Sequence, residues 1–260
     1  MSVRQRPARA APGQHFLRSS RLAAELVRDA GVAPGELVVD VGAGTGVITR
    51  ALVDAGARVH AVEADPALAV LLRRRFDERG VTVVEADALR HPWPDEPFTI
   101  VANLPFAGSR AILAAALHPA GQLRQADVIV QWELAQKESA VWPATLRSTF
   151  WRAWFDLTIV ARLSRSAFGP APSVDAGVLR ATRRAVPLLP VDDHRRYRGF
   201  LEHAWGARTT VDRALRGRVS RRELRRLASV LGFDDSARPR DLDARQWSQV
   251  FAFVELRRTK

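Results

Sequence analysis

The stretch LVVDVGAGTG, residues 37–46, decides the fold. Its first five residues form a short apolar run, which is typical of a buried β-strand. Gly42, Gly44 and Gly46 follow this run directly, and a helical pattern starts at Val47. Glycines allow the backbone to turn tightly and to approach a ligand closely. We therefore expect a strand, a ligand-binding turn and a helix in immediate succession.

Beyond this stretch, short β-branched runs alternate with helical patterns as far as residue 181. This rhythm predicts an α/β fold, with a parallel sheet covered by helices on both faces. Further strands are expected at residues 58–62, 81–84, 98–102, 126–131, 155–161 and 176–181. Helices are expected at residues 47–55, 66–79 and 110–117.

The pattern after Pro187 and Pro190 is helical only. Ser220 and Glu223 have the spacing of a capping box, and Gly232 is a natural helix stop. Helices are expected at residues 193–204, 210–216, 220–231 and 246–257. The sequence therefore predicts a basic, disordered segment of residues 1–13, a first domain of residues 14–186, and a small helical domain of residues 187–260.

The composition excludes several classes of protein. The chain has no Cys, which excludes a disulfide scaffold, a zinc–thiolate site and a cysteine nucleophile, and suits a cytoplasmic protein. Hydrophobic residues make up 47% of the chain, enough for a core, so a disordered chain is excluded. No apolar run reaches the roughly 20 residues of a membrane span, and the N-terminus lacks the apolar region of a secretion signal. We expect neither membrane insertion nor secretion.

Positive charge is concentrated at both ends of the chain. The formal net charge is +12. Residues 1–30 contain six cations and two acids, residues 31–182 contain 15 and 16, and residues 183–260 contain 19 and ten. This distribution indicates a polyanionic partner such as nucleic acid. The alternative is a solvated helical surface that is merely rich in arginine.

Two carboxylates follow the next two expected strands. Glu63 comes at the end of residues 58–62, where an acid can accept both hydroxyl groups of a ribose. Asp87 comes just after residues 81–84, where a carboxylate can accept from the amino group of an adenine. Each acid alone is equally well explained as an ordinary strand-end residue, but three features at three successive strand ends indicate an adenosine ligand. The GxGxG spacing of the glycines differs from the GxGxxG of nicotinamide-dependent oxidoreductases, and this difference disfavours that class.

Asn103, Leu104, Pro105 and Phe106 follow the fourth expected strand, at the same edge of the sheet. An adenine 6-amino group is a poor nucleophile because its lone pair is delocalised into the ring. The side-chain carbonyl of Asn103 and the main-chain carbonyl of Leu104 can each accept one amino hydrogen, which favours a pyramidal nitrogen. Pro105 stiffens the loop, and Phe106 offers a face on which a flipped-out base can stack. The alternative is an ordinary strand-to-helix turn, in which Asn and Pro are common.

These motifs resemble those of the ribosomal RNA adenine N-methyltransferases. The resemblance extends through residues 14–17 (QHFL), 131–137 (QWELAQK) and 167–175 (AFGPAPSVD), and runs from about residue 14 to residue 256. It implies a Rossmann-like, seven-stranded domain with an antiparallel last pair of strands, followed by a small helical domain that binds RNA. It also implies S-adenosylmethionine as the methyl donor, no metal, and methylation of the 6-amino group of an adenine.

Residue by residue, the resemblance implies two sets of contacts. The set at the methyl donor is Gln14, His15, Leu17, Gly42, Gly44, Gly46, Glu63, Ala64, Asp87, Ala88 and Asn103. The set at the target adenine is Asn103, Leu104, Pro105, Phe106 and Phe168, with the two phenylalanines on opposite faces of the base. His15 stands where Asn is common in the family, so main-chain contacts are expected there. The alternative for Phe168 is packing in the core.

Within the family, the sequence looks most like the Erm methyltransferases, which modify an adenine of 23S rRNA and confer resistance to macrolide, lincosamide and streptogramin antibiotics. Phe106, where the sister branch usually has Tyr, and the Trp-rich residues 142–154 favour this branch. The expected partner is 23S rRNA before complete ribosome assembly, and the expected state is a monomer. Two alternatives remain, namely the sister branch, which dimethylates two adenines of 16S rRNA, and a non-catalytic RNA-binding factor on the same fold. Intact Asn103 and Glu63 argue against the second.

Trp142, Trp151 and Trp154 could lie either at an RNA-binding surface or in the core. Aromatic side chains can stack on RNA bases, but they usually lie in protein cores. We expect at least two of the three to lie in the core.

Overall fold

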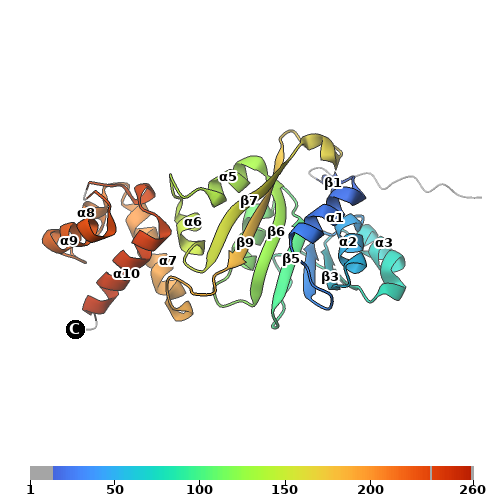
Figure 1. Cartoon of the computed structure of the whole chain (residues 1–260), viewed down its shortest axis with the longest axis horizontal. Helices are drawn as coiled ribbons and strands as arrows, with labels where there is room; N and C mark the ends of the chain where they lie inside the picture. The colour runs from blue at the N-terminus through green and yellow to red at the C-terminus, as the bar shows by residue number, and fades with distance from the viewer. Residues whose placement is uncertain (1–13, 235, 259–260) are drawn as a thin grey trace, which may run out of the picture. The chain divides into compact units, whose positions relative to one another are not determined.

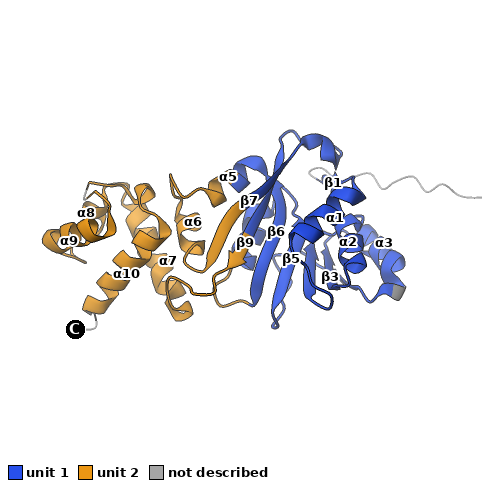
Figure 2. Ribbon diagram, in the orientation of Figure 1, with its two compact units in different colours: residues 1–116, 122–135, 159–180 blue, residues 117–121, 136–158, 181–260 orange. Residues whose placement is uncertain are grey.

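A computed structural model of the chain describes residues 14–234 and 236–258. The predicted basic segment of residues 1–13 lies outside the described residues. Within the described part, no helix is long and apolar enough to cross a membrane. The chain divides into two compact units (Figure 2). Of the described residues, unit 1 contains 14–116, 122–135 and 159–180, and unit 2 contains 117–121, 136–158 and 181–258.

A mixed, seven-stranded sheet is the framework of the chain, with the strand order β4-β3-β2-β5-β6-β9-β7 (Figure 1). All seven expected strands are present, and the five from β2 to β6 are paired in parallel. All five residues of β2 are buried, because β2 lies between two other strands in a sheet covered by helices. The strands are β2 (Leu37–Val41), β3 (Arg58–Glu63), β4 (Thr82–Glu85), β5 (Phe98–Asn103), β6 (Leu123–Gln131), β7 (Phe155–Leu163) and β9 (Ala176–Arg183).

Side-chain caps begin two helices of unit 1. α3 (Pro66–Phe76) follows Asp65, whose carboxylate accepts from two main-chain N–H groups of the first turn. α1 (Ser20–Asp29) lies outside the predicted helices, and the hydroxyl of Ser19 caps it. The other helices that lie wholly or partly in unit 1 are α2 (Val47–Asp54), α4 (Ser109–Ala116), α5 (Trp132–Ser139), and the 3-10 turns η1 (Asp77–Arg79) and η2 (Arg165–Ala167).

Two very short strands join distant segments of unit 1. β1 (Phe16–Leu17) pairs in the antiparallel direction with β8 (Phe168–Gly169). The main-chain N–H of Arg18 extends this pairing by donating to the carbonyl of Ala167 at 3.0 Å. A strand of two residues has no periodicity, so the sequence pattern predicts neither. The pairing holds the N-terminal motif of residues 14–17 against the loop that carries Phe168.

The helices of unit 2 pack around aromatic side chains. The ring of Tyr197 lies 5.2–6.3 Å, between centroids, from the rings of Phe150, Trp154 and Phe251. Trp151 and Trp154 are buried, whereas Trp142 is exposed. The helices of this unit are α6 (Leu146–Trp151), α7 (His194–Gly206), α8 (Val211–Ala214), α9 (Arg221–Leu231) and α10 (Ala244–Arg258), with the 3-10 turns η3 (Val191–Asp193) and η4 (Pro239–Asp241).

The cap of α9 is the predicted one. Ser220 and Glu223 form the capping box, and Gly232 ends the helix in the left-handed conformation.

Residues 136–158 belong to unit 2, although the sequence analysis includes them in the first domain. The indole N–H of Trp154 donates to the carbonyl of Leu189 at 3.1 Å, and the main-chain N–H of Leu188 donates to the carbonyl of Ala153 at 2.8 Å. These contacts cross residue 187. A boundary at that residue would therefore cut through the core of unit 2.

A buried acid joins β2 to α2. Asp40 is 1% exposed, and the hydroxyl of Thr49 donates to its carboxylate at 2.7 Å. Burial raises the pKa of Asp40 from its ordinary value of 3.8 to about 7, although the hydrogen bond from Thr49 opposes the rise. The negative charge of Glu63 adds to the rise. The folded protein therefore binds a proton at Asp40 more tightly than the unfolded chain does.

This difference in proton binding predicts a pH dependence of stability. Between about pH 4 and pH 7 the folded state holds more protons than the unfolded state, so the contribution of Asp40 to the free energy of unfolding falls as pH rises, by on the order of 1 kcal/mol per pH unit. Asp40→Asn keeps an acceptor for Thr49 and cannot ionise. We expect chemical denaturation to show a flatter pH profile for this variant than for the wild type.

The matched control is Asp54→Asn, which removes an exposed carboxylate from α2. It should keep the wild-type pH profile. Parallel pH profiles of the free energy of unfolding for the wild type and Asp40→Asn would contradict the assignment of this pH dependence to Asp40.

Candidate active site

A cavity of about 210 Å³ lies beyond the carboxyl ends of the parallel strands of unit 1. The carboxyl ends of parallel strands meet at one edge of a sheet, which is the usual ligand-binding edge in such folds. The cavity is lined by residues that follow four successive strands and by the N-terminal motif. Of the predicted site residues, those that line it are Gln14, His15, Gly42, Glu63, Ala64, Asp87, Ala88, Asn103, Leu104, Pro105 and Phe106.

The glycine turn after β2 folds back toward two neighbouring segments. Gly42 has a φ of 71°, and a Cβ atom there would lie 3.3 Å from Cδ of Pro105. Gly44 has a φ of 57°, and a Cβ atom there would lie 2.8 Å from the ring of Phe16. Both the left-handed backbone and the close approach of these neighbours therefore require glycine. Gly42 lines the cavity, whereas Gly44 and Gly46 are not among its lining residues.

Glu63 connects the glycine turn to the start of α3. Its side chain is largely buried, at 6% exposure. One carboxylate oxygen accepts from the N–H of Gly44 at 2.8 Å, and the other accepts from the N–H of Asp65 at 2.9 Å. A carboxylate oxygen can accept two hydrogen bonds. Each oxygen therefore keeps acceptor capacity at the cavity wall.

Asp87 is the exposed acid of the site. One of its carboxylate oxygens accepts from the N–H of Leu89 at 2.9 Å, and its main-chain carbonyl accepts from the N–H groups of Arg90 and His91. The turn after β4 thus holds this side chain at the cavity. Ala88, the next residue, also lines the cavity.

Asn103 is the last residue of β5, and only one of the two polar groups of its side-chain amide has a hydrogen-bond partner. The NH₂ group donates to the main-chain carbonyl of His15 at 2.7 Å. The carbonyl oxygen Oδ1 is buried and has no hydrogen-bond partner. Buried polar atoms almost always have a partner, and leaving one without costs roughly 1–3 kcal/mol. An unpaired acceptor that is held in place at a cavity is therefore suited to a ligand that donates a hydrogen bond.

The three residues after Asn103 form a stiff turn. The N–H of Leu104 donates to the carbonyl of Ile129 at 3.1 Å. The carbonyl of Pro105 accepts from the N–H of Gly108 at 3.0 Å and from the hydroxyl of Ser109 at 2.9 Å. The turn thus leads directly into α4.

The ring of Phe106 lies close to two other rings. Its centroid is 5.3 Å from that of His15 and 6.2 Å from that of Phe168. Phe168 is fully buried and lies in the hydrophobic core of unit 1, outside the cavity lining. It meets Phe106 edge to face, at an interplanar angle of 67°.

The predicted sandwich of a base between Phe106 and Phe168 does not fit this arrangement. A base between two parallel rings needs about 7 Å between them, twice the roughly 3.5 Å contact distance. The observed rings touch each other instead. Phe168 has the place of a core residue that supports Phe106 from behind, and Leu17, its neighbour across the β1–β8 pair, is likewise buried outside the cavity.

The sequence analysis misses several residues that line the cavity. Phe16 lies inside the quoted motif of residues 14–17. Successive side chains of a strand point to opposite faces, so Phe16 and the buried Leu17 face opposite ways, and this alternation is the signal that could have identified Phe16. The others adjoin predicted site residues or lie on α4 and carry no motif of their own. These residues are Phe16, Val41, Val62, Asp65, Ala86 and Ile112.

The site therefore combines two acids, a glycine turn and one unpaired amide acceptor. Within the described residues, no group of three or more His, Asp or Glu side chains is arranged to hold a metal ion. The polar groups can accept hydrogen bonds from hydroxyl and amino groups, and the apolar groups can contact a flat ring. Such a lining matches a nucleoside.

Comparison with known proteins agrees with this geometry. The chain is 33% identical over 242 residues to the mycinamicin-resistance protein MyrB of Micromonospora griseorubida, covering 92% of this chain and 76% of that protein. It is 33% identical over 253 residues to the ribosomal RNA small subunit methyltransferase A of a Synechococcus species, covering 90% of this chain and 88% of that protein. The crystal structure of the 23S rRNA methyltransferase ErmE superposes with a TM-score of 0.82 at 29% identity, covering 92% of this chain and 99% of that one.

The ribosomal RNA adenine dimethylase family matches residues 6–256, which is nearly the whole chain. Both the sequence relatives and the similar structure are rRNA methyltransferases or resistance proteins by their descriptions. The chain belongs to the ribosomal RNA adenine dimethylase family.

Proposed function

We propose that this protein methylates the 6-amino group of an adenine in 23S rRNA, and that it thereby confers resistance to macrolide, lincosamide and streptogramin antibiotics. The chain is an enzyme of the rRNA adenine N-6-methyltransferase family. The observation that carries the proposal is the unpaired, buried Oδ1 of Asn103 at the cavity. An adenine 6-amino group would supply the hydrogen-bond donor that this oxygen atom lacks.

The residues present fit S-adenosylmethionine, the methyl donor of this family. We assign the ribose hydroxyl groups to Glu63, whose two oxygens keep acceptor capacity beyond their main-chain bonds. We assign the donor's adenine to Asp87 and Ala88, and its remaining part to the glycine turn and to Gln14 and His15. Gly42 lines the cavity and has no side chain, which allows the ligand to approach the backbone closely there.

The donor supplies a methyl group on a positively charged sulfonium, which is already an activated leaving group. The protein therefore has to orient the adenine amine and keep water out. Asn103 accepts one amino hydrogen and the main-chain carbonyl of Leu104 accepts the other, so the nitrogen becomes pyramidal and its lone pair faces the methyl group. The amine needs no strong base before attack, because its proton becomes acidic only after methylation.

Phe106 supplies the stacking face for the extruded adenine. Its ring is half-buried, and Phe168 backs it from the core. This assignment changes the role of Phe168 from a second stacking face to a support for the first.

Similarity to MyrB and to ErmE supports 23S rRNA as the substrate, as does Phe106 in place of Tyr. We further propose that the enzyme acts as a monomer on rRNA before the ribosome is fully assembled. The second candidate is methylation of 16S rRNA, which the 33% identity to the Synechococcus small subunit methyltransferase supports.

A single experiment separates the two candidates. The protein is incubated with methyl-labelled donor and with separated 16S and 23S rRNA, and the product is mapped by primer extension. Label in 23S rRNA with a stop at one adenine supports the proposal, since a dimethylated adenine blocks reverse transcriptase. Label in 16S rRNA alone supports the second candidate, and no label in either RNA contradicts both.

The proposed role of Asn103 predicts a specific loss. Asn103→Ala should lower the rate of methyl transfer about 100- to 1,000-fold, the usual effect of removing one hydrogen bond to a transition state. Binding of the methyl donor, measured by calorimetry, should weaken much less than turnover, because Glu63 and Asp87 are intact although the bond to His15 is lost, and thermal melting should confirm that the variant is folded. Turnover within a few-fold of wild type would contradict the role.

The proposed role of Glu63 predicts weaker donor binding. Glu63→Gln removes the charge and half of the acceptor capacity, so the dissociation constant of the donor should rise about ten- to a hundred-fold. Glu85→Gln is the matched control, because Glu85 pairs with Glu63 in register on β4 but is exposed and ion-paired with Arg73. The control should bind the donor normally. Equal affinity of both variants and wild type would make Glu63 a purely structural residue.

The basic face of α9 is proposed to hold RNA phosphates. Arg222 and Arg226 are exposed, and they lie four residues apart on one side of this helix. Their joint change to Gln should reduce the slope of log affinity against log salt by about 1.4 on single-stranded RNA, about 0.7 for each lost contact. The control is the joint change to Gln of Arg58 and Arg73, which are ion-paired with Glu96 and Glu85. Identical slopes for the two double variants would exclude α9 as an RNA contact.

A further inference from the structure

Trp142 has an unusual place for a tryptophan. It is 60% exposed, and among the described residues it is the only exposed Phe, Tyr or Trp. Val141 and Pro143 on either side of it are exposed as well. Tryptophan is highly buried on average, so an exposed one at the tip of a loop needs a reason outside the core.

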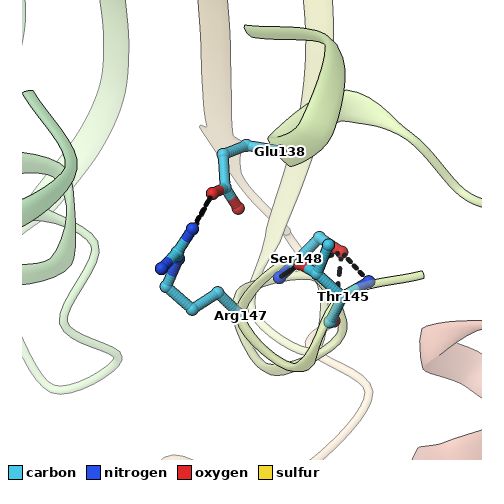
Figure 3. A network of polar contacts seen from close by, with 4 residues as sticks. All are labelled: Glu138, Thr145, Arg147 and Ser148. Carbon is cyan, nitrogen blue, oxygen red and sulfur yellow. Dashed lines mark hydrogen bonds and ion pairs between the residues drawn. The ribbon is translucent and has the colours of Figure 1, made fainter. Parts of the chain in front are cut away.

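The loop that carries Trp142 is fixed at both ends (Figure 3). Glu138 in the last turn of α5 is buried, and its carboxylate pairs with the guanidinium of Arg147 in the first turn of α6 at 2.5 Å. The hydroxyl groups and main-chain N–H groups of Thr145 and Ser148 form a capping box at the start of α6. The guanidinium of Arg152 donates to the carbonyl of Ser139 at 2.5 Å. Residues 141–143 therefore project from a loop whose two ends are held in place.

A main-chain hydrogen bond links this loop to a turn that carries two arginines. The N–H of Ala144 donates to the main-chain carbonyl of Arg240, in the 3-10 turn η4, at 2.9 Å. Both Arg238 and Arg240 on this turn are exposed. An exposed indole on a loop that is bonded to this turn can stack on a base, and exposed guanidinium groups on the turn can contact the phosphates of the same strand.

We propose that Trp142 stacks on an unpaired base of the rRNA substrate while Arg238 and Arg240 contact the adjoining phosphates. The inference rests on the proposed function and adds an RNA-binding contact outside the active-site cavity. Charge selects RNA over a protein partner, because residues 183–260, which include this turn, contain 19 cations and ten acids. A held loop also loses little conformational entropy when it binds.

The test compares equilibrium binding of the full-length variants to 23S rRNA transcribed in vitro, over a series of salt concentrations. Trp142→Ala should weaken binding by about five- to a hundred-fold, the usual effect of losing one base–aromatic stack. The loss should be the same at each salt concentration, so the salt slope should not change. Trp142→Phe, which keeps a flat ring, should recover most of the affinity. The joint change of Arg238 and Arg240 to Gln should instead reduce the slope by about 0.7 for each contact on single-stranded RNA.

Val186→Ala is the matched control, because Val186 is an apolar side chain of unit 2 that is 81% exposed. It should bind RNA like the wild type, and all variants should keep the wild-type melting temperature. Wild-type affinity of Trp142→Ala for the RNA would overturn the inference. Unchanged RNA binding of Trp142→Ala together with reduced methylation of ribosomal particles would also overturn the inference, because that result would assign Trp142 to a protein contact. Absence of methylation by the wild type would overturn the proposed function, and the binding data would still decide the inference.

Discussion

The hydrogen bond from the Asn103 amide to the carbonyl of His15 is the constraint on which the site depends. It ties the end of β5 to the N-terminal motif, and β1 ties that motif to the loop of Phe168. It also fixes the direction of the amide, so that Oδ1 stays unpaired at the cavity. Pro105 extends the same connection to the glycine turn, because it packs against Gly42. Four segments that are distant in sequence are thereby assembled around one acceptor atom.

Two acids on either side of the glycine turn in the sequence have separate tasks. Asp40 is buried against Thr49, its pKa is raised to about 7, and it holds β2 to α2. Glu63 instead receives two main-chain N–H groups and keeps acceptor capacity toward the cavity. Environments that differ in this way allow one acid to serve the fold and the other to bind a ligand. The glycine turn lies between these two acids in the sequence, and the N–H of Gly44 donates to Glu63.

Much of this could be predicted from the sequence, for reasons that the structure makes clear. β2, β3 and β5 have strong apolar patterns, and parallel pairing brings Glu63, Asp87 and Asn103 to one edge whatever the details of packing. The β1–β8 pair could not be predicted, because strands of two residues have no period. The burial of Phe168 and the inclusion of residues 136–158 in unit 2 depend on tertiary packing of aromatic rings, and a single sequence does not specify which rings meet. For the same reason the sequence could not distinguish the exposed Trp142 from the buried Trp151 and Trp154.

The account rests on the claim that Asn103 Oδ1 accepts from the amino group of the target adenine. A crystal structure of the protein with S-adenosylhomocysteine and a short RNA that contains the methylated adenine site tests it most directly. The account predicts the adenine 6-amino nitrogen about 2.7–3.2 Å from Oδ1, with the Asn103 NH₂ group still bonded to His15 and the base against the ring of Phe106. An adenine bound elsewhere, or an Oδ1 turned toward a protein donor in the complex, would contradict it.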